Sequence, residues 1–405
     1  MGITTYNLLF AVCGLIIVSY VFTIVNRLTR IPSVLLLLGL GMFLRYLSDS
    51  YGLAILVPKS LIEFLGIIGL IMIVLEAGLD LKVTKDHLPL VRRSFLSALI
   101  IFVFSSLSVA GILFWWDNGT PFIHCLVYAI PLSIVSSAVV LPSVSHLEHE
   151  KKEFLIYEAS FSDIIGILFF NLFTAAVNVG INEILWFCSS IIIAILLSIL
   201  ICFILMWLLI NNRISVKFFL SFAVLITIYV GGKILHLPSL IVILMFGLVM
   251  NNWVLVRWKP LKRFFSDESV ENEAQFLKSI TTESSFLIRT FFFVLFGFGI
   301  TLDYFMNMQL IQLGLLIVVL LIFLRFVYLR LVHKYNLLPE LFYIPRGLIT
   351  VLLFYKIPEW QRINSFDEGV LFFVILATGI ILMLGSIFYR DRPVEIVNID
   401  KTINT

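Results

Sequence analysis

Residues 31–42 read IPSVLLLLGLGM, and residues 237–250 read LPSLIVILMFGLVM. The second stretch looks like a copy of the first, because each opens with Pro-Ser and continues as an apolar run that contains glycine. A second pair of similar stretches, VLEAGLD at 74–80 and VLFGFGITLD at 294–303, follows in the same order. Two matches in matching order predict an internal repeat.

The composition around these stretches is that of a membrane protein. Of the 405 residues, 61% are hydrophobic and 13% are charged, and the mean hydropathy is +1.09. A helix needs about 20 apolar residues to cross a hydrocarbon core about 30 Å thick, and such runs fill the chain. We therefore expect an all-helical polytopic membrane protein without a soluble domain. Its first apolar run is expected to be a retained span rather than a signal peptide.

Apolar runs bounded by charges, Pro, Gly or Asn predict thirteen transmembrane helices. Their ranges are 6–26, 32–48, 60–80, 93–116, 122–145, 154–179, 184–211, 216–233, 238–256, 284–302, 308–332, 340–357 and 368–390. The two copies of the repeat then lie seven helices apart. Because that number is odd, the second copy crosses the membrane in the opposite direction, which predicts inverted repeats.

Lys and Arg are distributed unequally between the two sides of this arrangement. Most of the 28 basic residues fall in loops on the side of the C-terminus. Five fall on the opposite side, namely Arg45, Lys59, Lys233, Lys356 and Arg362. Cytoplasmic loops are enriched in Lys and Arg, so the N-terminus is predicted outside and the C-terminus in the cytoplasm.

Charge and cysteine usage argue against two kinds of partner. The net charge is +3, and the basic residues lie in loops rather than in one patch, so nucleic acid is not expected as a partner. The four cysteines, at positions 13, 125, 188 and 202, fall inside apolar runs without metal-ligand spacing. They predict neither a disulfide framework nor a metal cofactor.

Two predicted helices contain residues that interrupt a helix. The fifth contains SSAVVLP at 136–142, and the twelfth contains IPRG at 344–347. Proline removes a backbone donor, and glycine loosens a helix. The separation of seven helices pairs these two helices as copies. In secondary transporters, broken helices that meet at the midplane direct half-helix ends toward an ion.

Six charged residues fall in the interior of predicted spans, away from the span ends, where an ionised group costs at least about 2.5 to 3.5 kcal/mol. They are Glu76, Glu158, Asp163, Arg289, Arg325 and Arg346. Three acids and three bases can form structural ion pairs that keep the bundle neutral, but this reading does not account for the broken helices. We expect Glu158 to pair with Arg325, and Arg289 and Arg346 to be accessory charges. Glu340, at a helix start, is expected to be a surface cap.

These residues resemble the monovalent cation:proton antiporter family, in particular its sodium/proton exchanger branch. In that branch the sixth helix carries Glu, three residues, then Asn-Asp. Here EASFSD, from Glu158 to Asp163, fits this motif with Ser162 in place of Asn. Residues 135–140, VSSAVV, are similar to the family's broken fifth helix.

Three further motifs carry the resemblance along the chain. Glu76-Ala-Gly matches the third-helix acid, and Arg325 matches the arginine of the eleventh helix. Arg346-Gly is similar to the Arg-Gly motif of the second broken helix. The resemblance extends from Pro32 to about the thirteenth helix.

The resemblance implies a secondary antiporter, not an enzyme, that exchanges a monovalent cation, sodium first, for protons across a bacterial-type inner membrane. Asp163 is then the group that binds either the cation or a proton. Ser162, Ser136 and Ser137 are candidate oxygen ligands, and Glu76 is a further one. The family also implies a homodimer and no cofactor.

The resemblance further implies a core bundle that moves against a panel. The expected ranges are 1–84 (panel helices 1 to 3), 85–181 (core helices 4 to 6), 182–212 (linker helix 7), 213–303 (panel helices 8 to 10), 304–392 (core helices 11 to 13) and 393–405 (cytoplasmic tail). Exchange is expected to be electroneutral, since Ser162 does not titrate and the Arg325 guanidinium keeps its proton.

Two other classes of membrane protein remain open on the sequence. A glycan-assembly enzyme usually needs a substantial external loop, whereas the longest predicted loop, about 257–283, is cytoplasmic. A sodium-coupled organic-anion symporter has a related fold and would bind a second solute. Exchange in vesicles without such a solute separates these readings.

Overall fold

The computed structural model describes most of the chain. The described residues are 5–52, 58–81, 88–117, 119–144, 146–175, 181–211, 217–234, 239–253, 267–300, 307–333, 338–363 and 366–389. The predicted tail, 393–405, lies outside them. Within the described residues every regular element is a helix.

The helices follow one another in the predicted order. Those of the first half are α1 (Thr5–Thr29), α2 (Ser33–Ser50), α3 (Lys59–Asp80), α4 (Leu88–Trp116), α5 (Phe122–Ser133), α6 (Ser137–Ser143), α7 (His149–Ala175) and α8 (Ile181–Asn211). Those of the second half are α9 (Lys217–Ile234), α10 (Ser239–Asn251), α12 (Asp267–Phe298), α13 (Met308–His333), η3 (Glu340–Phe342), α14 (Leu348–Tyr355), η4 (Glu359–Gln361) and α15 (Glu368–Phe388). Each predicted range overlaps a helix, and eight helical segments of the described part are long and apolar enough to cross a membrane.

The two helices expected to be interrupted are broken in the structure. The chain leaves the helix between α5 and α6, at residues 134–136, and it runs without helix from 343 to 347 before α14. Pro345 explains the second break, because proline lacks an amide hydrogen and disfavours helical dihedrals in the residue before it. The two breaks bring non-helical backbone into the interior, where other protein groups must satisfy its polar atoms.

One expectation about a loop is wrong. Residues 267–283, placed in a long cytoplasmic loop, form the first turns of α12, which begins at Asp267. The buried residues Val270, Ala274, Leu277 and Thr281 recur every three or four positions on this segment. That spacing places them on one face of a helix. Most of the residues between them are polar, so the segment is not an apolar run and the sequence did not predict it as a helix.

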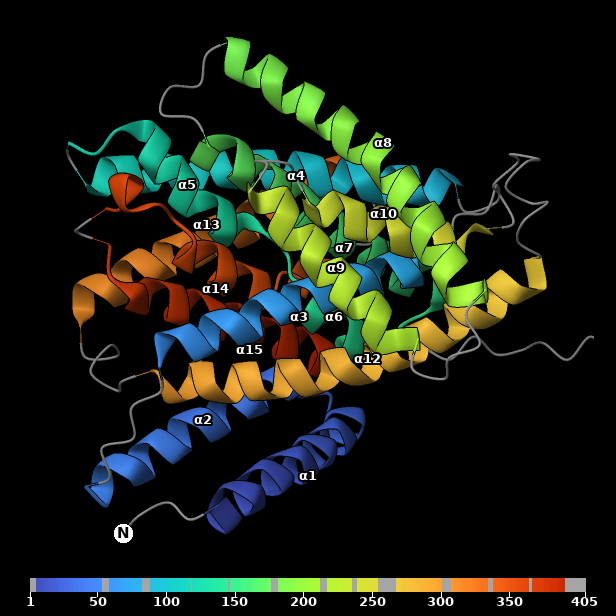
Figure 1. Cartoon of the computed structure of the whole chain (residues 1–405). Coiled ribbons are helices and arrows are strands. Elements are labelled where there is room, and N and C mark those ends of the chain that lie inside the picture. Colours follow the sequence, from blue (N-terminus) through green and yellow to red (C-terminus); the bar gives the residue numbers. More distant parts are fainter. Residues whose placement is uncertain are drawn as a thin grey trace, which may run out of the picture.

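The helices form two packing groups (Figure 1). In the first, which we call the panel, α12 lies between α2 and α3, α3 packs on α10, and α1 and α9 pack on these helices. In the second, the core, α4 packs on α5, α7 and α13, and α13 packs on α15. The two short helices after the breaks belong to the core as well, because α6 packs on α7 and α14 packs on α5. α8 packs mainly on α10 of the panel. α3 also packs on α14, so the two groups meet there.

Glycines allow the panel helices to cross with their backbones in contact. At the first crossing, Gly41 of α2 faces Gly297 of α12. A Cβ on Gly41 would lie 2.3 Å from the carbonyl oxygen of Val294, and a Cβ on Gly297 would lie 2.4 Å from that of Leu38. No larger residue fits at either position without moving a helix.

A second crossing repeats the first between α3 and α10. Here a Cβ on Gly247 would lie 2.9 Å from the carbonyl oxygen of Leu75, and a Cβ on Gly78 would lie 2.7 Å from that of Leu244. In both crossings each glycine approaches the carbonyl three residues before the glycine of the partner helix. The two crossings therefore have the same local geometry.

Candidate functional site

Asp163 lies on α7 at the point where α7 faces the broken helix α5/α6. Its side chain is buried, at 4% exposure. The backbone N–H of Ser137, the first residue of α6, donates to Asp163 Oδ2 at 3.1 Å. The amide groups at a helix start have no partner within the helix, so Asp163 supplies an acceptor to one of them.

The two broken helices contact each other through their backbones. The N–H of Ser136 donates to the carbonyl oxygen of Pro345 at 2.9 Å. A Cβ on Gly347 would lie 2.5 Å from Ser136 Oγ and 2.9 Å from Ser136 Cβ. Glycine at 347 therefore permits the close approach of the two non-helical segments beside Asp163.

Ser162, the residue before Asp163, fixes the position of the broken helix. Its Oγ accepts a hydrogen bond from the N–H of Val135 at 2.9 Å. Val135 lies between α5 and α6, where the backbone amide has no helical acceptor. Ser162 thus supplies an acceptor for a backbone amide at the break, and the next residue, Asp163, contacts the start of α6.

Two buried oxygen atoms at this position lack a hydrogen-bond partner among the described residues. They are Asp163 Oδ1 and Ser136 Oγ. Buried polar atoms are usually paired, because leaving one unpaired costs about 1 to 3 kcal/mol. Oxygen atoms in this situation are suited to bind a proton or a hard cation.

Glu158, one turn before Ser162 on α7, binds Arg325 of α13 inside the core. Arg325 Nη1 and Nη2 donate to the two carboxylate oxygens at 2.6 and 2.7 Å. Both side chains are fully buried, and Ser97 Oγ also donates to Glu158. Arg325 Nε donates to the carbonyl oxygen of Glu340 at 3.1 Å, so every nitrogen of the guanidinium has an acceptor.

Arg346 lies in the non-helical segment before α14 and binds backbone carbonyls. Its Nε donates to the carbonyl oxygen of Leu132, near the end of α5, and its Nη1 donates to that of Ile344 at 2.9 Å. The last carbonyls of a helix carry partial negative charge. Arg346 thus places a positive charge where two interrupted segments expose carbonyl groups.

Glu76 and Arg289 lie on the panel helices α3 and α12 and face each other. Arg289 Nη2 lies 3.8 Å from Glu76 Oε1. Arg289 Nη1 also donates to the carbonyl oxygen of Ala138 in α6 at 3.3 Å. Glu76 therefore reaches the broken helix through an arginine, whereas Asp163 contacts α6 directly.

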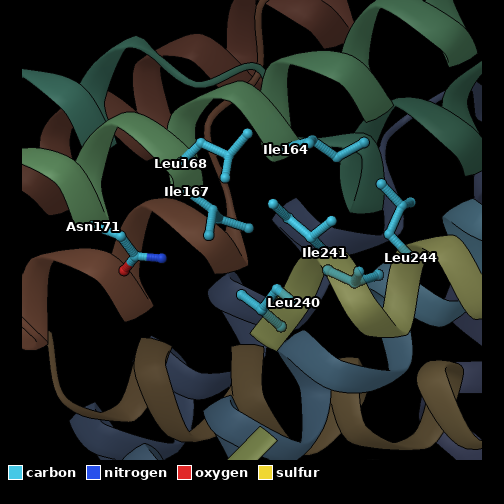
Figure 2. Close-up of a pocket in the computed structure, with 8 residues that line it drawn as sticks. Ile164, Ile167, Leu168, Asn171, Leu240, Ile241 and Leu244 are labelled. Atoms are coloured by element: carbon cyan, nitrogen blue, oxygen red, sulfur yellow. The ribbon is translucent and has the colours of Figure 1, made fainter. Parts of the chain in front are cut away.

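A narrow pocket lies between α7 and the panel (Figure 2). Figure 2 shows Ile164, Ile167, Leu168 and Asn171 of α7 facing Leu240, Ile241 and Leu244 of α10. Val74 of α3 completes the lining. All of these side chains except Asn171 are apolar.

Two features of the site were not expected from the sequence. Glu340, expected to be a surface cap, is buried at 5% exposure. The second feature is the hydrogen bond that the carbonyl oxygen of Ala138 accepts from Arg289. Its helical donor would be the amide of residue 142, which is a proline, and that spacing was a signal available in the sequence.

Comparisons with known proteins agree with this geometry. The model of the transmembrane sodium/hydrogen exchanger family matches residues 14–388. Two structures of the sodium proton antiporter MjNhaP1 from Methanocaldococcus jannaschii resemble the chain. The structure at pH 8 has a TM-score of 0.62 at 16% identity, covering 93% of this chain and 92% of that one. The electron microscopy structure has a TM-score of 0.64 at 18% identity, covering 96% and 100%. No curated protein sequence matches the chain.

Proposed function

Because the chain belongs to the sodium/hydrogen exchanger family, an integral multi-pass transporter family, we propose that it exchanges a monovalent cation, sodium first, for protons by alternating access at Asp163. The observation that carries this proposal is the position of Asp163. It is a buried carboxylate with one oxygen held by the first amide of α6 and the other unpartnered among the described residues. Such a group accepts either a proton or a desolvated cation, and the two ligands compete for it.

The atoms around Asp163 fit a hard monovalent cation. Ser136 Oγ is buried and has no hydrogen-bond partner in the described part of the chain, and Ser137 adds a second hydroxyl. Hydroxyl, carboxylate and carbonyl oxygens are the ligands of hard cations. Ser162 Oγ is engaged with Val135, so we assign it to holding the broken helix rather than to the first contact with the cation.

Alternating access requires two bodies that move relative to each other. We propose that the core moves against the panel, with α8 as the linker. The equivalent glycine crossings support an inverted repeat, because each half contributes one partner to each crossing. Half-repeats related by an in-plane axis give a site that opens to either side in turn. The basic loops support a cytoplasmic C-terminus.

We also propose that exchange is electroneutral. Arg325 keeps its proton at any accessible pH, and Ser162 does not titrate. Glu76 is the other candidate carrier, but it lies on the panel, 3.8 Å from Arg289, and not on the core helix that carries Asp163. A single carboxylate at Asp163 then crosses neutral with either ligand.

The family's homodimer is proposed for this chain through the panel. α1 is an outer helix, and Phe10, Ile17 and Tyr20 on it are exposed. Lipid or a second copy would cover these side chains. Cross-linking in native membranes at α1 distinguishes the two.

The test is cation-driven proton movement in proteoliposomes without an organic solute. The parent protein should collapse an imposed pH gradient when sodium is added, and Asp163→Asn should fold and insert but exchange nothing. Asp49→Asn is the matched control, because Asp49 pairs with Arg45 at the protein surface. Exchange by Asp163→Asn at the parent rate would contradict the assignment. Sodium uptake that required an organic anion would indicate symport instead.

A further inference from the structure

Arg289 connects three elements of the fold. Its Nε donates to the carbonyl oxygen of Ser285 on its own helix at 3.2 Å. Its Nη2 lies 3.8 Å from Glu76 Oε1 on α3, and its Nη1 donates to the carbonyl oxygen of Ala138 on α6 at 3.3 Å. The side chain is 15% exposed. The first two contacts are within the panel, and the third reaches the core.

The contact with Ala138 has a cause in the sequence of α6. In an α-helix the carbonyl of residue 138 would accept from the amide of residue 142. Residue 142 is proline and has no amide hydrogen. The Ala138 carbonyl oxygen therefore needs a donor from outside α6, and Arg289 supplies it. Ala138 follows Ser137, whose amide binds Asp163, so this contact lies next to the proposed ion site.

The panel side of Arg289 is held firmly. α3 and α12 pack along each other, and a second ion pair joins them where Lys278 Nζ lies 2.7 Å from Asp80 Oδ1. The guanidinium is thus anchored to the panel through Glu76 and extends to one carbonyl of the core. Motion of the core along the panel must break the contact with Ala138 while the contacts within the panel remain.

The contact with Ala138 and the pocket involve different helices of the core. The pocket follows α7 from Ile164 to Asn171, toward the end of that helix. Arg289 instead contacts the first turn of α6, whose chain leads to the start of α7. In this conformer Arg289 bridges the panel to α6, whereas the pocket lies between α7 and α10.

We propose that Arg289 is a positioning residue of the exchange cycle, which holds the core against the panel through the Ala138 carbonyl and releases it when the core moves. This inference rests on the proposed alternating access. The simpler alternative is that Arg289 only neutralises Glu76. The two readings differ in whether losing Arg289 changes the balance between conformers.

The experiment measures that balance without measuring transport. Ala138→Cys places a thiol at a residue that is 2% exposed, and its labelling rate by a water-soluble thiol reagent in nanodiscs reports how often the interface opens. Peptide mass spectrometry reads each cysteine separately. Cys125, buried in α5, reports global unfolding in the same sample.

In the Ala138→Cys background, Arg289→Gln should raise labelling of position 138 about tenfold, the effect of losing one hydrogen bond from a charged donor. Labelling of Cys125 should not change. Lys278→Gln is the matched control, because Lys278 lies on the same helix and its ion pair with Asp80 is within the panel. This variant should leave both labelling rates unchanged. If Arg289→Gln does not fold, Arg289→Lys keeps the charge but not the planar fork, and it should also raise labelling at 138.

A double variant separates the two readings. If Arg289 only neutralises Glu76, adding Glu76→Gln to Arg289→Gln should restore the parent labelling rate. Under the proposal the double variant stays labelled at the higher rate, because the Ala138 carbonyl is still released. An unchanged rate at 138 in Arg289→Gln, or an equal rise at Cys125, would overturn the proposal. Absence of sodium/proton exchange in the parent protein would overturn the proposed function. The labelling rates would still show whether Arg289 holds the core against the panel.

Discussion

Arg325 and Glu158 form a bidentate ion pair between α13 and α7, with N–O distances of 2.6 and 2.7 Å. The two residues are 167 positions apart in the chain. Each would otherwise be an uncompensated charge inside the core. The pair therefore links the two halves of the core beside the proposed ion site.

Removing one partner of this pair should destabilise the protein strongly. Glu158→Ala should lower the free energy of unfolding in detergent by about 3 to 5 kcal/mol, because it leaves a buried charge unpaired, and adding Arg325→Ala should cost little more. The exposed pair Arg45 and Asp49, 2.9 Å apart, is the control, and its removal should cost about 1 kcal/mol or less. Additive losses for Glu158 and Arg325 would show that the two side chains do not interact.

Two glycines on α2 should respond differently to the same substitution. Gly41→Ala should destabilise the panel by about 1 to 3 kcal/mol, because the new Cβ would lie 2.3 Å from a backbone oxygen of α12. Gly39, two residues earlier, has nothing within 4 Å of its added Cβ, so Gly39→Ala should be neutral or slightly stabilising. Thermal unfolding in detergent measures both. Equal effects at the two positions would contradict the close crossing of α2 and α12.

Gly347 should be needed for the crossing of the broken helices. Gly347→Ala should reduce exchange and thermal stability together, because its Cβ would meet Ser136 Oγ and Cβ at 2.5 and 2.9 Å. Gly111→Ala on α4, where nothing lies within 4 Å, should change neither. Full exchange activity of Gly347→Ala would show that the segments at Ser136 and Gly347 can separate without cost.

Voltage should not shift the exchange equilibrium if one cation moves for one proton. The measurement is cation-driven proton flux in proteoliposomes at several clamped potentials, with potassium as the clamp ion, or sodium if potassium is transported. Two protons per cation would shift the equilibrium by about 2.3 kcal/mol per 100 mV. A shift of that size would indicate a second proton carrier. Glu76→Gln then tests whether Glu76 is that carrier.

The sequence by itself determined the class of protein and the position of most helices. A span must satisfy its own backbone hydrogen bonds in lipid, so each one reads as a local apolar run, and every predicted range overlaps a helix of the described residues. The breaks near Ser136 and Pro345 were also readable, because proline acts on its immediate neighbours. The start of α12 was missed because its buried residues are separated mostly by polar ones.

The tertiary structure alone decided which helices meet and in what register. Gly41 meets Gly297 and Gly78 meets Gly247, because a close crossing of two backbones needs glycine at the point of contact, and the sequence does not say which glycines meet. The partners of the buried charges depend on packing in the same way. Composition requires that Arg289 and Arg325 find acceptors, and the expected pairing of Arg325 with Glu158 is confirmed. Only the arrangement of the helices directs Arg289 to both Glu76 and the carbonyl that Pro142 leaves free.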